Sequence, residues 1–138
     1  MVEGGPFELS LILRGRRLDQ KKITALLGHT PTRSRVRGES RTTRSAVSFE
    51  IKVSAWVLST EGASPSACVD LLANELGGRI PDLSKLPNVE EAYFDMFIPF
   101  ERGRSVGSEI RLDWEPAALT ELSHARIPLV LTFAVIGL

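Results

Sequence analysis

The clearest pattern in the chain is a run of alternating apolar and polar residues over positions 47–57. All six odd positions are apolar, from Val47 to Val57, and the even positions between them are mostly polar. Alternation with a period of two is typical of a β-strand that places one face in a hydrophobic core. The pattern therefore predicts a strand over 47–57, with Trp56 and Leu58 on the face opposite its apolar side.

Three further strands and three helices are predicted from similar signals. Residues 7–13 alternate as a half-buried strand, and residues 92–100 place Phe94, Met96 and Ile98 on one face. Helices are expected where a capping residue precedes an apolar stripe: from Asp19 to Gly28, from Ser64 to Gly77, and after Asp113 or Glu115. Residues 127–136 form a last strand that is apolar on both faces, so we expect cover on both sides rather than a bare edge.

The order of these elements predicts an α+β fold. Two strand–helix–strand units with a further helix between them have the connectivity of a ferredoxin-like sandwich. We expect a mostly antiparallel four-stranded sheet with the first and third helices on one face, and an extra middle helix. This middle helix either covers the second face, or leaves that face as a patch for a second copy or a partner. The second face would carry Trp56, Leu58, Tyr93 and Phe97.

Composition narrows the class of protein. A length of 138 residues fits a single domain over 1–138, and a hydrophobic fraction of 43% is too high for a disordered chain. The single cysteine excludes an intramolecular disulfide framework and a cysteine-based zinc cluster. No apolar run approaches the length of a membrane span, and the N-terminus lacks the regions of a signal peptide. We therefore expect a soluble cytoplasmic protein.

A net charge of zero hides a strong segregation of charge along the chain. Residues 14–44 contain ten basic and two acidic side chains, a net charge of +8, so the rest of the chain carries −8. The densest part, at about 32–46, interleaves arginines with Ser, Thr and Gly, which predicts a flexible loop. Its arginines are Arg33, Arg35, Arg37, Arg41 and Arg44.

Three roles fit this arginine-rich segment. Arginine presents a planar fork that suits carboxylates and phosphates, so the segment could bind an acidic protein or follow a nucleic-acid backbone. It could also be a solvated loop that pairs with the acidic remainder of the chain. Single-strand nucleic-acid binders usually stack bases on aromatic side chains, and this segment has none. An acidic protein partner is therefore placed ahead of nucleic acid or a phosphorylated ligand.

The histidines and the cysteine each have a structural explanation. His29 and His124 both follow predicted helices, where the helix dipole favours histidine, and no neighbouring His or Cys supplies a third metal ligand. Cys68 falls on the apolar stripe of the second helix, which is typical of a buried cysteine rather than of a nucleophile.

The carboxylates of interest are also explained by structure. Glu90 and Glu91 precede a strand, and Asp113 or Glu115 can cap a helix, although either pair could in principle do acid–base chemistry. No phosphate loop, nucleophile elbow, dinucleotide fingerprint or metalloprotease motif occurs. We therefore predict no catalytic residue, no metal site and no cofactor, and hence a protein that is not an enzyme.

One stretch resembles a known family. Residues 23–32 run Ile-Thr-Ala-Leu-Leu-Gly-His-Thr-Pro-Thr, and are followed by Gly38-Glu39 and by the segment Trp-Val-Leu-Ser-Thr at 56–60. This resembles the bacterial family called domain of unknown function 4279, with its helix end, its Gly-Glu or Gly-Asp pair and its "W-x-x-S" strand end. The resemblance spans most of the chain, but residues 132–136 are more apolar than the acidic ending of the family. It implies no established activity, cofactor or catalytic residue, and a role as an immunity or other interaction protein, as suspected for some relatives.

Taken together, these patterns predict a non-catalytic interaction module of the immunity type, which binds a protein partner or a second copy of itself and no membrane. Aromatic residues on the second face would anchor the partner, and arginines would steer it and pair with its acidic groups. The alternative is nucleic-acid or phosphorylated-ligand binding through the arginine-rich loop. The predicted binding residues are Arg33, Arg35, Arg37, Arg41, Arg44, Trp56, Tyr93 and Phe97.

Overall fold

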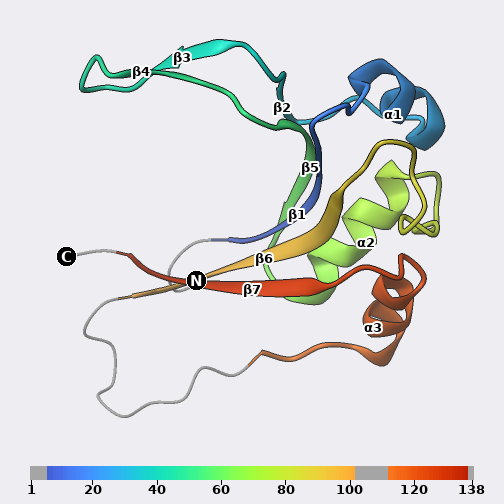
Figure 1. Ribbon diagram of the computed structural model, residues 1–138. Helices are drawn as coiled ribbons and strands as arrows, with labels where there is room; N and C mark the ends of the chain where they lie inside the picture. Colours follow the sequence, from blue (N-terminus) through green and yellow to red (C-terminus); the bar gives the residue numbers. More distant parts are fainter. Residues whose placement is uncertain (1–5, 102–111, 137–138) are drawn as a thin grey trace.

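The computed structural model describes residues 6–101 and 112–136 (Figure 1). Within these ranges the chain forms three helices and seven strands. In chain order they are β1 (Phe7–Gly15), α1 (Gln20–Leu27), β2 (Arg33–Arg35), β3 (Ser40–Thr42), β4 (Ser48–Glu50), β5 (Ser54–Gly62), α2 (Pro65–Glu75), β6 (Glu91–Glu101), α3 (Pro116–Ser123) and β7 (Leu129–Ile136). No helix in these ranges is long and apolar enough to cross a membrane.

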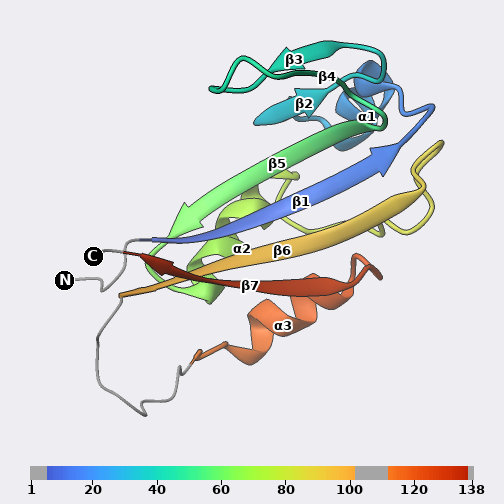
Figure 2. The same cartoon turned by 60° about the vertical axis from the view of Figure 1, so that its left-hand side comes forward.

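Five strands form one mixed sheet in the order β2-β5-β1-β6-β7 (Figure 2). β1 lies in the middle, antiparallel to both β5 and β6, whereas β7 is parallel to β6. Strands β3 and β4 pair with each other as a separate two-stranded sheet. The fold is thus α+β as predicted, and most pairings in the main sheet are antiparallel, but this sheet has five strands rather than the expected four.

The ferredoxin-like arrangement is not confirmed. α2 connects β5 to β6, which are parallel to each other with β1 between them, and α3 connects β6 to its parallel neighbour β7. β1 leads through α1 to β2, which is parallel to β1 with β5 between them. Both strand–helix–strand units of a ferredoxin-like sandwich also join parallel strands. The observed sheet departs from such a four-stranded sandwich at its edge, where α3 and β7 add a strand parallel to β6, and in the β3–β4 hairpin between β2 and β5.

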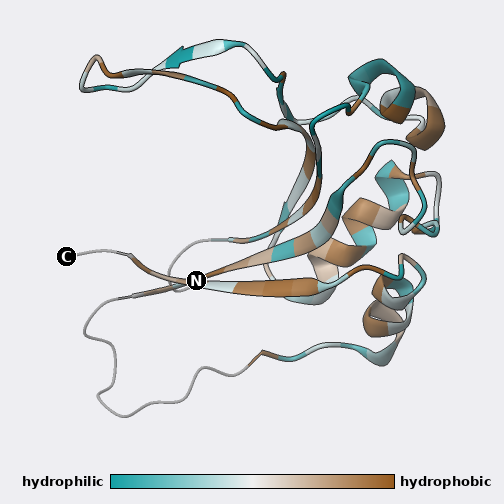
Figure 3. Ribbon diagram, viewed as in Figure 1, coloured by the Kyte–Doolittle hydropathy of each residue, from teal (hydrophilic) through white to brown (hydrophobic). Residues whose placement is uncertain are grey.

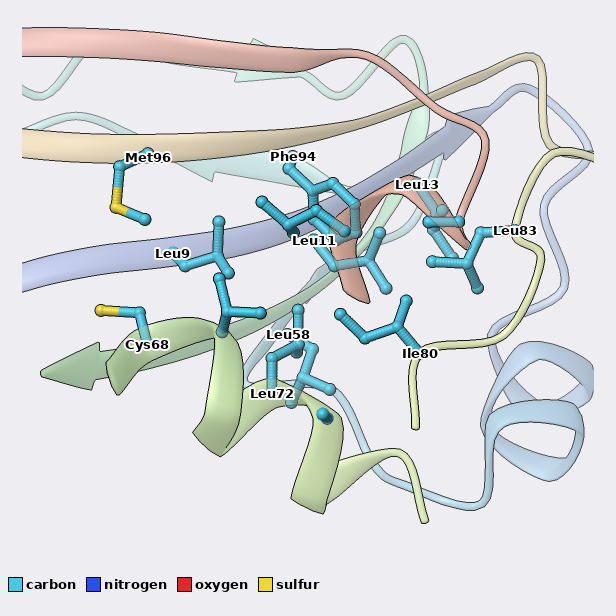
Figure 4. Close-up of a cluster of buried hydrophobic side chains, with 14 of the residues drawn as sticks. Leu9, Leu11, Leu13, Leu58, Cys68, Leu72, Ile80, Leu83, Phe94 and Met96 are labelled. Atoms are coloured by element: carbon cyan, nitrogen blue, oxygen red, sulfur yellow. The ribbon is translucent and has the colours of Figure 1, made fainter. Parts of the chain in front are cut away.

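All three helices lie on the same side of the sheet (Figure 1). α2 packs against β1, β5 and α3. The middle helix therefore leaves the second face uncovered, which is one of the two predicted arrangements. The covered face holds the core (Figure 4). Leu11 of β1 lies opposite Leu58 of β5 and Phe94 of β6, and all three are buried. The other face is free of helices in the described part of the chain.

Capping residues set the ends of the first two helices as predicted. Asp19 accepts a hydrogen bond from the backbone N–H of Lys22 at 3.2 Å, and Gly28 ends α1 with a φ of 71°. Ser64 accepts a hydrogen bond from the backbone N–H of Ala67 at 3.1 Å, at the start of α2. Local sequence signals are therefore sufficient to place these two helices.

The strand predicted over 47–57 is in fact two strands separated by a break. Residues 51–53 lie between β4 and β5, and after them the even positions face the helices. Trp56 is fully buried on the covered face, and its Nε1–H donates to Oγ1 of Thr24 at 3.1 Å. Leu58 is buried on the same face. The prediction that both residues lie on the second face is wrong, because the helices cover the even positions of β5 and its apolar odd positions face the cleft described below.

The last strand is confirmed as β7, but its expected cover is not found. β7 is the outermost strand, and within the described ranges no strand pairs with its free side. Much of β7 is hydrophobic (Figure 3). Its apolar side chains are exposed, with Leu131 at 42% and Phe133 at 49%. Helix α2 packs over β1 and β5 rather than over this edge. The prediction of cover on both sides is therefore wrong for the described residues.

Candidate functional site

The face of the sheet that carries no helix contains a cleft of about 620 Å³. One wall is the sheet, and another is formed by β3, which stands apart from the sheet with β4 as a two-stranded hairpin (Figures 1 and 2). The volume is in the range of ligand-binding sites in proteins. Four arginines and a set of mostly apolar side chains line this cleft: Ile12, Arg14, Arg33, Ser34, Arg35, Arg41, Val53, Ala55, Val57 and Tyr93.

The floor of the cleft is apolar because three neighbouring strands place suitable residues side by side. Ile12 of β1 lies opposite Val57 of β5 on one side and opposite Tyr93 of β6 on the other. Ala55 and Val53 extend this floor towards the start of β5. Ile12, Val57 and Tyr93 are only half-buried, so a ligand that covers them removes apolar surface from water, which favours binding.

Arg33 and Arg35 reach the cleft because β2 pairs with β5 at the edge of the sheet. The register places them opposite Val57 and Ala55, and hence on the same face as the floor. Gln20 fixes β2 in this position, since its Nε2 donates to the carbonyl oxygens of Arg35 at 2.9 Å and of Ala55 at 3.0 Å. Neither guanidinium forms an ion pair with another described residue, so both are available to an anionic ligand.

The other two arginines of the cleft are paired, but only weakly. Arg14 lies 3.1 Å from a carboxylate oxygen of Glu91, and Arg41 lies 3.2 Å from one of Glu39. All four side chains are substantially exposed, and exposed ion pairs contribute only about 0.2–1 kcal/mol. A carboxylate or phosphate on a ligand can therefore replace either internal partner at little cost.

Half of the predicted binding residues meet in this cleft. Arg33, Arg35, Arg41 and Tyr93 all line it. The segment at 32–46 was expected to be a flexible loop, but it contains strands β2 and β3. Because alternate residues of a strand share a face, β2 brings Arg33 and Arg35 to the same side, which a loop would not ensure.

The other four predicted residues lie elsewhere. Arg37 lines a separate hollow, and Arg44 lies in the turn between β3 and β4. Phe97 is on the open face opposite Glu8, but it does not line the cleft. Trp56 is in the core on the other side of the sheet. The three aromatic residues therefore do not form the shared anchoring surface that the sequence predicted.

Six residues of the cleft were not predicted as binding residues: Ile12, Arg14, Ser34, Val53, Ala55 and Val57. The three residues from 53 to 57 were missed because the unbroken alternation assigned them to the core. Ile12 carried a usable signal, since it is apolar on the face of the first strand where Glu8 and Ser10 are polar. An apolar residue that interrupts a polar face is a candidate for the floor of a site.

Cys68 lies in the hydrophobic core (Figure 4). Its Sγ donates to the carbonyl oxygen of Phe7 at 3.4 Å. Burial raises the pKa of the Cys68 thiol to about 11. Since the thiolate is the nucleophilic form, this environment does not favour covalent chemistry at neutral pH.

Each histidine lies beside a single carboxylate. His29 pairs with Glu75, and Nδ1 of His124 lies 3.2 Å from a carboxylate oxygen of Glu121. In residues 6–101 and 112–136, no group of three or more His, Cys, Asp or Glu side chains is arranged to hold a metal ion. Each histidine therefore has a carboxylate side chain as its neighbour.

The neighbouring carboxylates at 90 and 91 lie beside the cleft, where each contacts an arginine. Glu91 pairs with Arg14, and Glu90 pairs with Arg16. Hydrogen bonds from the backbone N–H and then the side chain of Arg16 hold the pKa of Glu90 below its usual range. A carboxylate that stays ionised in this way is a poor proton donor near neutral pH. Glu115 precedes α3, and its side chain makes no capping hydrogen bond.

Comparison with known proteins identifies a family but no characterised relative. A search of curated proteins and a search of solved structures each returned no match. The sequence model of the family described as "Domain of unknown function (DUF4279)" matches residues 6–124, which include every strand and helix up to and including α3. The whole cleft falls within the matched range. The chain therefore belongs to the DUF4279 family.

Proposed function

We propose that this protein is a non-catalytic cytoplasmic interaction module that binds an acidic segment of a protein partner in the cleft. The observation that carries the proposal is the lining of the cleft, in which four arginines surround an apolar floor. Such a site suits a ligand with carboxylates next to aliphatic side chains, because charge pairing and apolar burial then act together.

Arg33 and Arg35 make the strongest case for an anionic ligand. Their guanidinium groups project on the open face, both are exposed, and neither has an acidic partner among the described residues. Gln20 holds the strand that carries them, so their spacing is set before a ligand arrives. Arginine forks pair with carboxylates in a bidentate manner, which gives geometric specificity as well as attraction.

A protein segment fits the cleft better than a nucleic acid. The apolar lining includes Ile12, Val53 and Val57, which match the side chains of a peptide rather than the faces of bases. Tyr93 is the one aromatic residue of this lining, whereas nucleic-acid binders stack successive bases on several. Glu91 at the rim would also repel a phosphodiester backbone.

Binding of a phosphorylated small molecule is the second candidate. It is favoured by the position of Tyr93 on the floor among four arginines, since an aromatic ring can stack on a base or another planar group while the arginines bind phosphate. This ligand would occupy the cleft alone and would compete with a peptide.

A peptide-display selection tests the proposal. A random dodecapeptide library is selected on the wild-type protein and, in parallel, on the variant Arg33→Ala/Arg35→Ala. Arg79→Ala/Lys85→Ala serves as a control with the same loss of charge, since both residues are exposed and line none of the hollows described here. We expect acidic peptides with aliphatic residues, which bind the wild type and the control equally and bind the cleft variant at least about tenfold more weakly.

Two results would contradict this proposal. One is that no enriched peptide distinguishes the cleft variant from the control. The other is that an oligothymidylate binds tightly at low salt, loses affinity steeply between roughly 50 and 200 mM salt, and displaces the peptides. The second result would assign the cleft to nucleic acid.

A further inference from the structure

A second basic hollow lies near the cleft, at the end of the sheet where β1 leads into α1. It has a volume of about 480 Å³ and is lined by Arg16, Arg17, Arg37, Asn88 and Glu90. No apolar side chain contributes to this lining, in contrast to the cleft. The two hollows therefore differ in the chemistry that they offer to a ligand.

A glycine allows the second hollow to form. A Cβ on Gly15 would overlap the carbonyl oxygen of Asn88, so only glycine lets the segment at 88–90 approach the end of β1 this closely. The backbone N–H of Glu90 then donates to the carbonyl oxygen of Arg14 at 2.8 Å. This contact brings Asn88 and Glu90 beside the arginines that follow β1.

A smaller hollow of about 200 Å³ joins the two. It shares Arg14 and Val53 with the cleft, and Arg16 and Glu90 with the second hollow. The three hollows thus form one groove, which starts over β2 and β5 and ends beside Arg17. We call it the arginine groove.

Charge along the arginine groove falls into three zones. At one end Arg33 and Arg35 have no ion-pair partner in the described residues, and at the other end Arg17 and Arg37 have none. The middle zone holds Glu91 and, at its border with the second hollow, Glu90, and both carboxylates already pair with arginines there. Hydrogen bonds from Arg16 favour the ionised form of Glu90, so this zone does not attract an anion. Unsatisfied positive charge is therefore concentrated at the two ends.

The length of the arginine groove follows from the strands beneath it. Val57 to Val53 is four residues of β5 and its start, and the register places Ile12 to Arg16 alongside this same stretch. At about 3.3 Å per residue this is a path of roughly 13 Å, which corresponds to about four residues of an extended peptide.

We propose that the bound segment is an extended peptide of about four residues with acidic residues at both ends and an uncharged middle. One end carries aliphatic side chains as well, since only the cleft has an apolar floor, and the other end is purely polar. This inference rests on the proposed function, and it adds the length of the segment and the order of its residues. A nucleic-acid strand does not match, because its charge repeats at every step, including the zone of Glu90 and Glu91.

The test uses the peptides selected on the wild-type protein, measured by fluorescence anisotropy. Arg17→Ala/Arg37→Ala removes the unpaired charge of the polar end, and Arg79→Ala/Lys85→Ala again controls for the loss of two charges. We expect the first variant to weaken the full peptides by about three- to tenfold and the control to leave them unchanged. Peptides truncated to their aliphatic acidic end should bind all three proteins with equal affinity.

The outcomes separate this inference from the proposed function. Full peptides that bind Arg17→Ala/Arg37→Ala as tightly as wild type, yet still depend on Arg33 and Arg35, would overturn the extended segment and leave the proposed function standing. Selected peptides with acidic residues at only one end would have the same meaning. Failure of every peptide to depend on Arg33 and Arg35 would overturn both. Thermal melts of each variant, monitored by circular dichroism, show whether it is folded.

Discussion

Leu11 and Ile12 are neighbours on β1, yet they lie on opposite faces of the sheet. Leu11 is fully buried among Leu58, Phe94 and the helices, whereas Ile12 is half-buried on the floor of the cleft. The same alternation divides β5, where Trp56 is in the core and Val57 faces the cleft. Successive residues of one strand thus have separate roles, one in stability and one in the proposed recognition, and substitutions can test the two faces independently.

The largest contrast is expected between Leu11→Ala and Ile12→Ala. Truncation of a fully buried leucine leaves a cavity, so we expect Leu11→Ala to lower the free energy of unfolding by about 3 kcal/mol. Ile12→Ala removes partly exposed surface and should cost less than about 1 kcal/mol, while it weakens the selected peptides. Urea denaturation measures the first effect and anisotropy the second. Equal destabilisation by the two variants would contradict the division between the faces.

The pH dependence of stability should reveal the burial of Cys68 in the core, on the covered face of the sheet. Burial raises the pKa of the Cys68 thiol from 9.0 to about 11, so the folded state keeps its proton where the unfolded state loses it. Stability from this group is present below pH 9 and is lost as pH rises towards 11, by up to about 2 kcal/mol. Urea denaturation at pH 8 and pH 10.5 measures this loss. Cys68→Ala is the control, and an equally steep decline in that variant would assign the loss to other groups.

A single buried hydrogen bond gives the next smaller effect. Thr24→Val removes the acceptor for the indole N–H of Trp56 and leaves that donor buried without a partner. We expect a loss of about 1–2 kcal/mol in the free energy of unfolding. Thr42→Val in β3 is the matched control, since Thr42 is exposed on the hairpin and should change stability by less than about 0.5 kcal/mol. Equal stability of the two variants would show that the hydrogen bond of Trp56 is not important.

Trp56 also shows how far the sequence could predict this structure. Capping residues and glycines placed the helices because these signals act over a few residues, and β1 and β6 were predicted with their core faces correct. The break at 51–53 was missed because it depends on hairpin contacts of Ile51, whose N–H donates to the carbonyl oxygen of Glu39 and whose carbonyl accepts from the N–H of Gly38. The faces of β5 were assigned wrongly because both carry apolar residues, and the packing of the helices decides which face is covered. Periodicity alone does not contain such long-range pairing.

The candidate site was only partly predicted, because it too depends on contacts between residues far apart in the sequence. Clustered charge identified Arg33, Arg35 and Arg41, and Tyr93 was identified as an aromatic residue on the face of its strand opposite the apolar one. The cleft exists only because β2 pairs with β5 and because β3 and β4 stand apart from the sheet, and both depend on tertiary contacts. The second hollow depends on the approach of Asn88 to Gly15, which no local pattern signals.

The smallest effect on stability, and the clearest effect on binding, is expected for Arg33→Ala/Arg35→Ala. Both side chains are exposed and form no ion pair with another described residue, so their removal should change the free energy of unfolding by less than about 0.5 kcal/mol. The association rate for acidic peptides should fall several-fold and depend less on salt, because the field that draws carboxylates to the cleft is weaker. Stopped-flow measurements at two salt concentrations determine both quantities, with Arg79→Ala/Lys85→Ala as the control. An unchanged association rate in a folded variant would remove the arginines from recognition and leave the apolar floor as the basis of binding, whereas a large loss of stability would show that β2 itself depends on these side chains.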